Sequence, residues 1–130
     1  MYMLDTNTLI YFFKGMGNVE KNLFSHTPKD ICILSIVLYE LQVGIAKSNN
    51  PQKREKQLST LLKQINVIGF SEEEAKESAL LRADLETKGT PIGPIDTLIA
   101  GSAKVNNLTL ITHNTNEFKR VEGLKLDDWF

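Results

Sequence analysis

The feature that most constrains the fold of this chain is the alternation of short apolar segments with longer helical patterns. The apolar segments have strand length, and most are followed at once by residues that turn the chain or cap a helix. Strands are expected at residues 2–4, 31–34, 65–70 and 108–111, with a further short strand at 124–126. Strands that alternate with helices are typical of a parallel sheet covered by helices on both faces. The sequence therefore predicts the α/β class.

Capping and breaking residues mark the ends of the helices between these strands. The expected helices are one that ends near Gly15, then 35–46 with Ser35 as its N-cap, 52–64, 71–89 and 95–105. Ser71 and Glu74, three residues apart, form a capping box, and Gly89 supplies a stop. The chain has 130 residues and no repeat, linker or low-complexity tract. We expect a single domain over residues 1–130.

Composition limits the partners and the compartment. The formal net charge is −1, so the chain lacks the overall basic signature of a nucleic-acid-binding protein. Positive charge nevertheless gathers at Lys47, Lys53, Arg54, Lys56 and Lys63 and again at Lys119, Arg120 and Lys125. These clusters permit a nucleic-acid partner without demonstrating one. No apolar run approaches the ~20 residues of a membrane helix, and the start MYMLDTN lacks a signal-peptide pattern. We expect no membrane association and a cytoplasmic location.

A single charge, Glu40, interrupts the otherwise uncharged and mostly apolar stretch Cys32–Ala46. A buried carboxylate without a partner is costly, so such a residue usually has a counter-charge or a metal ion nearby. Asp5 directly follows the first expected strand, Asp96 opens the helix after a Gly-Pro loop, and Glu117 lies in the loop after strand 108–111. Ligands of parallel α/β folds bind outside the carboxyl ends of the strands. These four acids are therefore candidates for one site.

Several carboxylates in one place are suited to a hard cation. Without an ion they would repel one another, whereas Mg²⁺ or Mn²⁺ favours oxygen ligands and relieves the repulsion. Such an ion can activate a water molecule and stabilise charge on a phosphoryl oxygen. Polar residues beside the acids could orient them or contact a phosphate; these are Thr6, Asn7, Thr112 and Asn114.

Each acid also has a structural explanation. Asp5 could simply cap a helix, and Asp96 could complement the helix dipole. Glu117 in a polar loop could be solvated, and one turn of helix could point Glu40 outward. Spacing alone leaves both interpretations open.

Four stretches taken together resemble the PIN-domain ribonucleases, and more narrowly the VapC toxins of bacterial toxin–antitoxin pairs. The stretches are MLDTN at 3–7, SIVLYEL at 35–41, GTPIGPIDTLIAGSA at 89–103 and LITHNTNEFKRVEGL at 110–124. They occur in the order and approximate spacing of that family. The resemblance implies a three-layer α/β/α fold with a central parallel sheet.

The resemblance also implies roles for individual residues. Asp5, Glu40 and Asp96 match the three metal-site acids of the family, and Glu117 takes the acidic place typical of the VapC branch. Asn114 stands where many PIN domains carry an Asp, so the division of roles between Asn114 and Glu117 is open. Thr6, Thr112 and Asn114 match accompanying polar positions. The implied activity is Mg²⁺- or Mn²⁺-dependent hydrolysis of an RNA phosphodiester, in which a water attacks the phosphorus in line and leaves a 5′-phosphate.

Partners follow from the same resemblance. VapC proteins pair as homodimers, and a VapB-type antitoxin silences them by laying its C-terminal segment across the active-site groove, which builds larger toxin–antitoxin assemblies. The apolar sides of helices 36–46 and 52–63 are the expected lining of that groove, although Leu58, Leu61 and Leu62 could equally be core residues. Arg82 matches an arginine often seen on the long helix, and a solvated helix charge explains it nearly as well.

Two other functions compete with the nuclease. A non-catalytic PIN-like module for RNA binding or assembly would share the fold, but the four intact acids argue against it. The run Asp5-Thr6-Asn7-Thr8 after a first strand resembles the motif of HAD phosphatases, which requires an acid where Asn7 stands.

Overall fold

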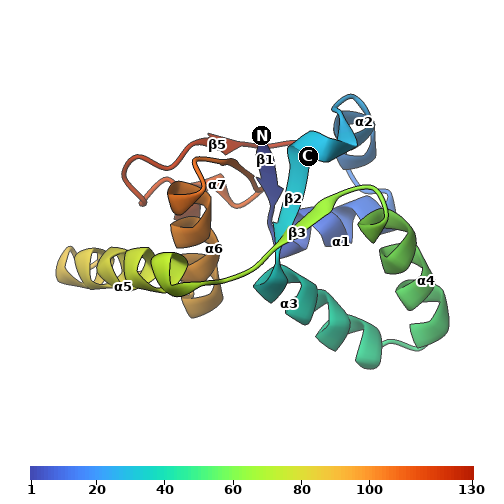
Figure 1. The fold of residues 1–130 in the computed structure, drawn as a ribbon, viewed down its shortest axis with the longest axis horizontal. Coiled ribbons are helices and arrows are strands. Elements are labelled where there is room, and N and C mark those ends of the chain that lie inside the picture. Colours follow the sequence, from blue (N-terminus) through green and yellow to red (C-terminus); the bar gives the residue numbers. More distant parts are fainter.

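The computed structural model describes all residues, Met1–Phe130, and is built on one five-stranded parallel sheet (Figure 1). The strand order across the sheet is β3-β2-β1-β4-β5, and all neighbouring pairs are parallel. The strands are β1 (Tyr2–Leu4), β2 (Ile31–Leu34), β3 (Asn66–Ile68), β4 (Thr109–Ile111) and β5 (Leu126–Asp127). The predicted α/β class with a central parallel sheet is confirmed.

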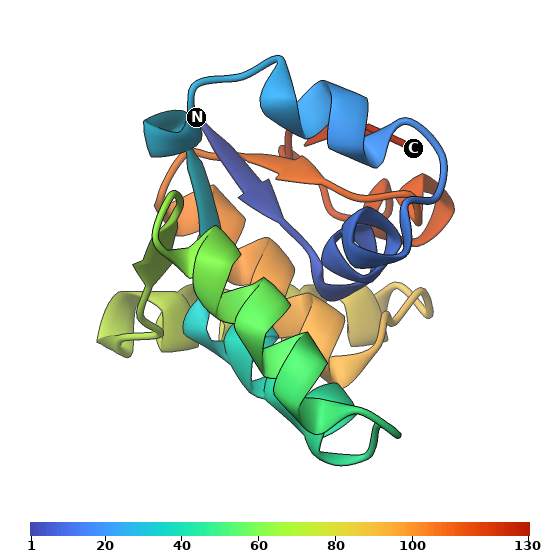
Figure 2. The ribbon, with the colours of Figure 1, turned by 90° about the vertical axis from the view of Figure 1, so that its right-hand side faces the viewer.

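Helices connect the strands and cover the sheet. They are α1 (Thr6–Lys14), α2 (Val19–Phe24), the 3₁₀ turn η1 (Pro28–Asp30), α3 (Ser35–Ala46), α4 (Pro51–Leu62), α5 (Glu72–Thr87), α6 (Pro94–Val105) and α7 (Thr115–Phe118). In Figure 2 the strands lie between α2 on one side and α4 and α6 on the other. No helix of the protein has the length and apolar character that crossing a membrane requires.

Several boundaries differ from the sequence-based expectation. Ser35 is the first residue of α3 and not its N-cap; Leu34 occupies the cap position and its side chain makes no capping hydrogen bond. Helix α4 begins at Pro51, because Asn50 caps it by accepting a hydrogen bond from the backbone N–H of Lys53 at 3.2 Å. The strand expected at 65–70 is shorter in the structure, where β3 spans Asn66–Ile68. The strand expected at 124–126 lies further along the chain, as β5 at Leu126–Asp127.

Three short helical segments, α2, η1 and α7, were not predicted. Each spans six residues or fewer, which is too short to show a helical period in the sequence. The consequence matters for Glu117, which was expected in a loop and instead lies within α7.

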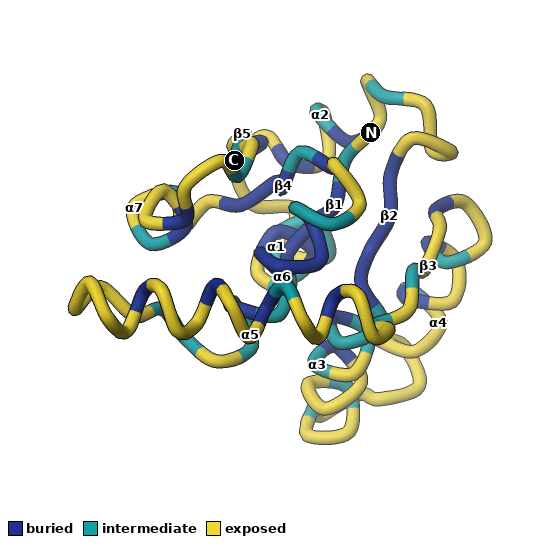
Figure 3. The backbone as a smooth tube through the Cα atoms, turned by 60° about the vertical axis from the view of Figure 1, so that its left-hand side comes forward, coloured by how far each residue is buried: buried dark blue, intermediate teal, exposed yellow.

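The core surrounds the sheet. All four residues of β2 are buried, as expected for an inner strand of a parallel sheet, and Figure 3 shows buried backbone along β2 and β4. The C-terminal segment docks onto the core through Trp129, whose side chain is 3% exposed and stacks on the His26 ring with centroids 4.5 Å apart.

Helix α5 packs chiefly against α6 and is exposed elsewhere along its length (Figure 3). The two helices approach closely where Gly101 of α6 faces Ser78 of α5. A Cβ atom at Gly101 would lie 2.1 Å from Ser78 Oγ and 2.9 Å from Ser78 Cα. Glycine is therefore required at this crossing, which fixes α6 and with it the start of the helix that carries Asp96.

Candidate functional site

The candidate site lies where the direction of strand addition reverses. Strand β1 is flanked by β2 on one side and by β4 on the other, so the carboxyl ends of β1 and β4 form a topological switch point. Leu4 pairs with Ile111 in the sheet, and the backbone N–H of Asp5 donates to the Ile111 carbonyl at 3.1 Å. Asp5 and Thr112 directly follow β1 and β4, so this pairing brings them side by side at this edge.

Asp5 caps helix α1 and is also buried, with 4% of its side chain exposed. Its Oδ1 accepts a hydrogen bond from the backbone N–H of Thr8 at 2.9 Å. Burial raises the pKa of the Asp5 carboxyl, hydrogen bonds from Thr112 and Thr8 partly lower it, and the nearby Glu40 raises it further. The capping role is thus real, but it does not explain why a second carboxylate is placed close to a buried one.

Helix α3 delivers Glu40 to the same place. Its side chain is half-buried, and its Oε1 accepts a hydrogen bond from the Thr6 hydroxyl in the first turn of α1. Glu40 therefore points toward the switch point and not outward into solvent. This explains the lone charge in the stretch Cys32–Ala46.

Asp96, in the first turn of α6, joins Asp5 and Glu40 at the site. Its pKa is raised to about 6, first by burial and then by the charges of Glu117, Asp5 and Glu40, with a side-chain hydrogen bond to Glu117 contributing as well. An acid that responds to all three other candidates must lie among them. The four predicted acids consequently share one site.

The sequence left open how Glu117 and Asn114 divide their roles, and the structure gives the two residues different contacts. Glu117 Oε1 accepts from the backbone N–H of Gly93 at 2.8 Å, and its Oε2 accepts from the Asn114 side-chain amide. Asn114 in turn donates its backbone N–H to Thr112 Oγ1 at 3.0 Å. The Glu117 carboxylate therefore interacts directly with Asp96, whereas Asn114 contacts the acids only through Glu117.

The predicted supporting residues divide into two groups. Thr6, Thr112 and Asn114 each hydrogen-bond to one of the acids or to another member of the site. Asn7 is exposed and its side chain makes no hydrogen bond within the protein. Sequence reasoning missed Gly93, whose N–H holds Glu117, and Thr8, whose hydroxyl donates to the Ile111 carbonyl at 3.2 Å. The sequence signal for Gly93 was its position between the two prolines of the loop before α6.

The donor set suits a hard divalent cation, since it consists of carboxylate oxygens alone. No three Asp, Glu, His or Cys side chains converge closely enough to hold an ion by themselves. Mg²⁺ characteristically uses one or two carboxylates and keeps several waters. Gly93 lies next to two of the acids, because a Cβ there would be 3.4 Å from Asp96 Oδ2 and 3.8 Å from Glu117 Oε1.

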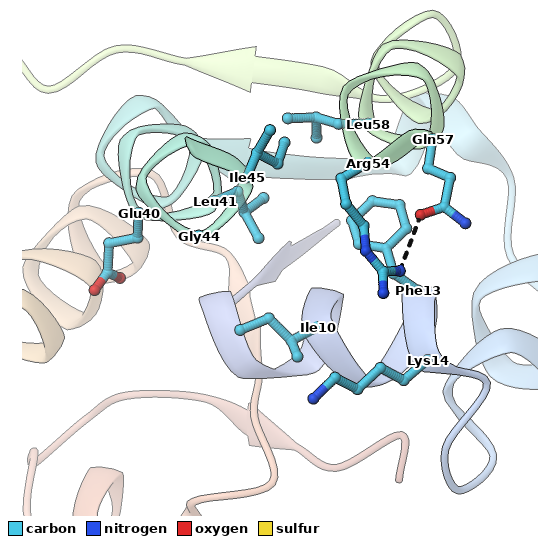
Figure 4. Close-up of a pocket in the computed structure, with 10 residues that line it drawn as sticks. All are labelled: Ile10, Phe13, Lys14, Glu40, Leu41, Gly44, Ile45, Arg54, Gln57 and Leu58. Atoms are coloured by element: carbon cyan, nitrogen blue, oxygen red, sulfur yellow. Dashed lines mark hydrogen bonds between the residues drawn. The ribbon is translucent and has the colours of Figure 1, made fainter. Parts of the chain in front are cut away.

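A groove leads away from this site between α1, α3 and α4 (Figure 4). It has a volume of about 280 Å³, with Glu40 at one end and Lys14 and Arg54 at the other. Its apolar lining comprises Ile10, Phe13, Leu41, Ile45 and Leu58. The groove was expected to be lined by the apolar sides of helices 36–46 and 52–63. Leu41 and Ile45 of α3 and Leu58 of α4 do line it. The core alternative also holds: Leu58 and Leu61 are 1% and 5% exposed, and Leu62 is partly buried against the core, so Leu58 borders the groove as a core residue.

Two side chains outside the site, Arg82 and His113, have local partners. Arg82 forms an exposed ion pair with Glu86 at 2.8 Å, one turn away on α5, which is the solvated helix charge that the sequence allowed. His113 pairs with Asp128 at 2.9 Å and stacks on Phe130.

Comparisons with known proteins agree with this geometry. The sequence matches the PIN domain family over residues 2–124. It is 35% identical over 128 residues to the tRNA(fMet)-specific endonuclease VapC of Salmonella typhimurium, covering 98% of this chain and 97% of the relative. It is 39% identical over 131 residues to ribonuclease VapC2 of Rickettsia felis, covering 99% and 98%. The crystal structure of Rickettsia felis VapBC2 bound to a DNA fragment from its promoter has a TM-score of 0.92, with 39% identity and coverage of 99% and 98%.

Proposed function

Because the chain belongs to the PIN domain family, we propose that its four carboxylates form the active site of a metal-dependent VapC-like ribonuclease toxin. Such an enzyme hydrolyses RNA phosphodiester bonds. The observation that carries the proposal is Asp96, whose pKa is raised to about 6 by burial and by Glu117, Asp5 and Glu40. Folding brings like charges together here at a cost, and a cation would offset that cost.

Mg²⁺ or Mn²⁺ fits the donor set, and we assign Asp5 and Asp96 as its innermost ligands with Glu40 and Glu117 around them. Bound there, the ion would activate a water and stabilise the charge that develops on the phosphoryl oxygens. The protein's own groups fix the geometry. Thr6 orients Glu40, Thr112 orients Asp5, and Gly93 with Asn114 holds Glu117 beside Asp96.

We further propose a structured RNA, such as a transfer RNA, as the substrate. The support is that a relative with 35% identity is named as a tRNA(fMet)-specific endonuclease. RNA of this kind is recognised by shape and by unpaired bases, which leave no short sequence motif in the protein. We place this reaction in the cytoplasm.

A VapB-type antitoxin is the proposed regulatory partner. The solved relatives with the same fold are VapBC complexes, including those of Rickettsia felis and Salmonella typhimurium. The apolar groove between α1, α3 and α4 starts at Glu40, so a segment laid in it would obstruct access to the acids. Pairing of two toxin copies stays a prediction.

The competing functions receive less support from the site. An RNA-binding module without catalysis has no need for acids that raise one another's pKa at a buried edge. A HAD phosphatase needs an acid at the position of Asn7, and Asn7 is exposed and without side-chain hydrogen bonds.

The test is cleavage of total cellular RNA by the purified, antitoxin-free protein with Mg²⁺ or Mn²⁺, followed by sequencing of the product ends. Asp5→Asn keeps the helix cap but removes a charge, so it is the matched variant, and EDTA removes the ion. Discrete cuts that disappear in both controls are the expected result. Absence of cuts from folded protein would favour the binding module, and cuts that persist in EDTA would exclude the metal.

A further inference from the structure

A second hollow, of about 620 Å³, lies between the end of α1 and helix α4. Three lysines from two distant segments line it, namely Lys14 at the end of α1 and Lys53 and Lys56 on α4. Glu20 is the one acid in the lining. The hollow therefore carries a local positive charge, although the whole chain has a net charge of −1.

This hollow continues the groove that begins at the carboxylates. Phe13, Lys14 and Gln57 line both of them. The groove has Glu40 at its far end, and Figure 4 shows Lys14 and Arg54 at the opposite end. A single path therefore runs from Glu40, one of the four acids, to Lys53 and Lys56.

The cations of this path form no ion pair within the protein. The ion pairs of the structure lie on α5 and α6 and at the C-terminus, and none includes Lys14, Lys53, Arg54 or Lys56. Arg54 donates to Gln57, a neutral side chain, at 3.4 Å. Unpaired cations on two facing elements are suited to an anionic partner with repeated charges.

An exposed aromatic ring packs against one of the residues that line the hollow. The Phe24 side chain is 62% exposed, and its ring meets Phe12, which lines the hollow, at a centroid distance of 5.9 Å. Proteins that bind unpaired RNA combine a positive groove with aromatic rings on which bases stack. An acidic peptide would use the lysines but would have less need for an exposed ring.

We propose that Lys14, Lys53 and Lys56 bind the phosphate backbone of the RNA on one side of the cleaved bond, and that Phe24 stacks on one of its unpaired bases. We call the surface formed by Lys14, Lys53, Lys56 and Phe24 the basic track. This inference rests on the proposed function, because it assumes that RNA is what reaches the carboxylates along the path.

The test measures RNA binding separately from cleavage. All proteins carry Asp5→Asn, and binding of fluorescein-labelled bulk transfer RNA is followed by anisotropy in EDTA at several salt concentrations. The track variant is Lys53→Gln with Lys56→Gln. Its control is Lys29→Gln with Lys76→Gln, which makes the same change of net charge at exposed lysines that lie outside the hollow and form no ion pair. Phe24→Ala is compared with Leu80→Ala, since Leu80 is 59% exposed on α5.

The track variant should bind more weakly, and its plot of log affinity against log salt should be shallower by about 1.5, because each phosphate contact contributes roughly 0.7–0.9. Phe24→Ala should weaken binding about fivefold or more at an unchanged slope. Both control variants should bind RNA with the affinity and salt dependence of the parent protein, which carries Asp5→Asn alone. Equal slopes for the two lysine pairs, or no measurable RNA binding by the parent, would overturn the proposal.

Two further outcomes separate this proposal from its premise. If the track variant keeps its RNA affinity but loses binding to labelled poly-L-glutamate, the surface binds an acidic protein segment and the proposal is wrong. If the track variant behaves as expected but the wild-type protein cuts no RNA with Mg²⁺ or Mn²⁺, the RNA-binding surface stands and the nuclease function fails.

Discussion

The Thr6 hydroxyl donates a hydrogen bond to Glu40 Oε1 and thereby joins the first turn of α1 to α3 across 34 positions of sequence. Glu40 is half-buried in an apolar helix and has no cation beside it, so this bond fixes the direction in which its carboxylate points. A residue that orients a metal-site acid typically affects metal affinity or activity by a factor of 10–100.

We therefore expect Thr6→Val, which keeps the shape but removes the hydroxyl, to lower kcat/KM for RNA cleavage by roughly 10–100-fold. Thr6→Ser should retain most of the activity, because it keeps the donor. The measurement is initial cleavage rate against RNA concentration at saturating Mg²⁺. Equal activity of the valine and serine variants would show that the bond does not position Glu40.

Asp96 should contribute to function at the expense of stability. Its carboxyl is half-buried among three like charges, so removal of the charge in Asp96→Asn relieves both burial and repulsion. We expect the variant to lose cleavage and to gain about 1 kcal/mol of unfolding free energy, which raises Tm by about 4 °C without added metal. Added Mg²⁺ should raise the Tm of the wild-type protein and leave the variant nearly unchanged. A variant less stable than the wild type in EDTA would contradict this account.

The pH dependence follows from the same group. The folded pKa of Asp96 is about 6, above its ordinary value of 3.8, so the folded state holds this proton more tightly than the unfolded state does. Its ionisation therefore costs stability as the pH rises through about 6. The gap in unfolding free energy between Asp96→Asn and the wild type should narrow from pH 7 to pH 4.5. Urea unfolding at several pH values tests this, and a gap that widens toward acid would refute it.

Lowering the pH should remove the destabilising charge of Asp96 but weaken the affinity of the wild-type protein for Mg²⁺. Below pH 6 a cation must displace the Asp96 proton, so Mg²⁺ affinity should fall by up to about tenfold for each pH unit. Isothermal titration with Mg²⁺ at pH 5, 6 and 7 measures the trend, and the heat in buffers of different ionisation enthalpy reports the released proton.

Glu117 and Asn114 should differ in importance. Glu117→Gln keeps an oxygen for the Gly93 N–H but removes the charge beside Asp96, so we expect a loss of kcat/KM of a hundredfold or more. Asn114→Ala removes one hydrogen bond to Glu117, and the expected loss is about tenfold. Parallel RNA cleavage assays compare them. A larger loss for Asn114→Ala would assign the central role to Asn114.

Much of the fold and the site followed from local sequence patterns. Buried strands such as Ile31–Leu34 and the capping box of Ser71 and Glu74 are encoded within a few residues, so both were predicted. The convergence of Asp5, Glu40, Asp96 and Glu117 followed from a topological rule together with the family resemblance.

The remaining features depend on contacts between distant segments. The bond from the Gly93 N–H to Glu117 spans 24 positions, and its donor is a backbone group that no side-chain pattern reveals. Asn7 lies beside Thr6 in sequence, yet the helical rotation of about 100° per residue turns it into solvent while Thr6 reaches Glu40. The basic track similarly requires the end of α1 to lie opposite α4.

The crossing of α5 and α6 gives a last prediction, about stability. A Cβ at Gly101 would meet the backbone Cα of Ser78 at 2.9 Å as well as its Oγ at 2.1 Å, so rotation of the serine side chain alone cannot make room. We expect Gly101→Ala to lower the free energy of unfolding by roughly 1–3 kcal/mol, measured by urea titration. Ser78→Ala is the matched change on the facing helix. It should be neutral or stabilising, because the Ser78 hydroxyl is buried without a hydrogen-bond partner. Equal midpoints for Gly101→Ala and the wild type would mean that α5 can shift away from α6 at little cost.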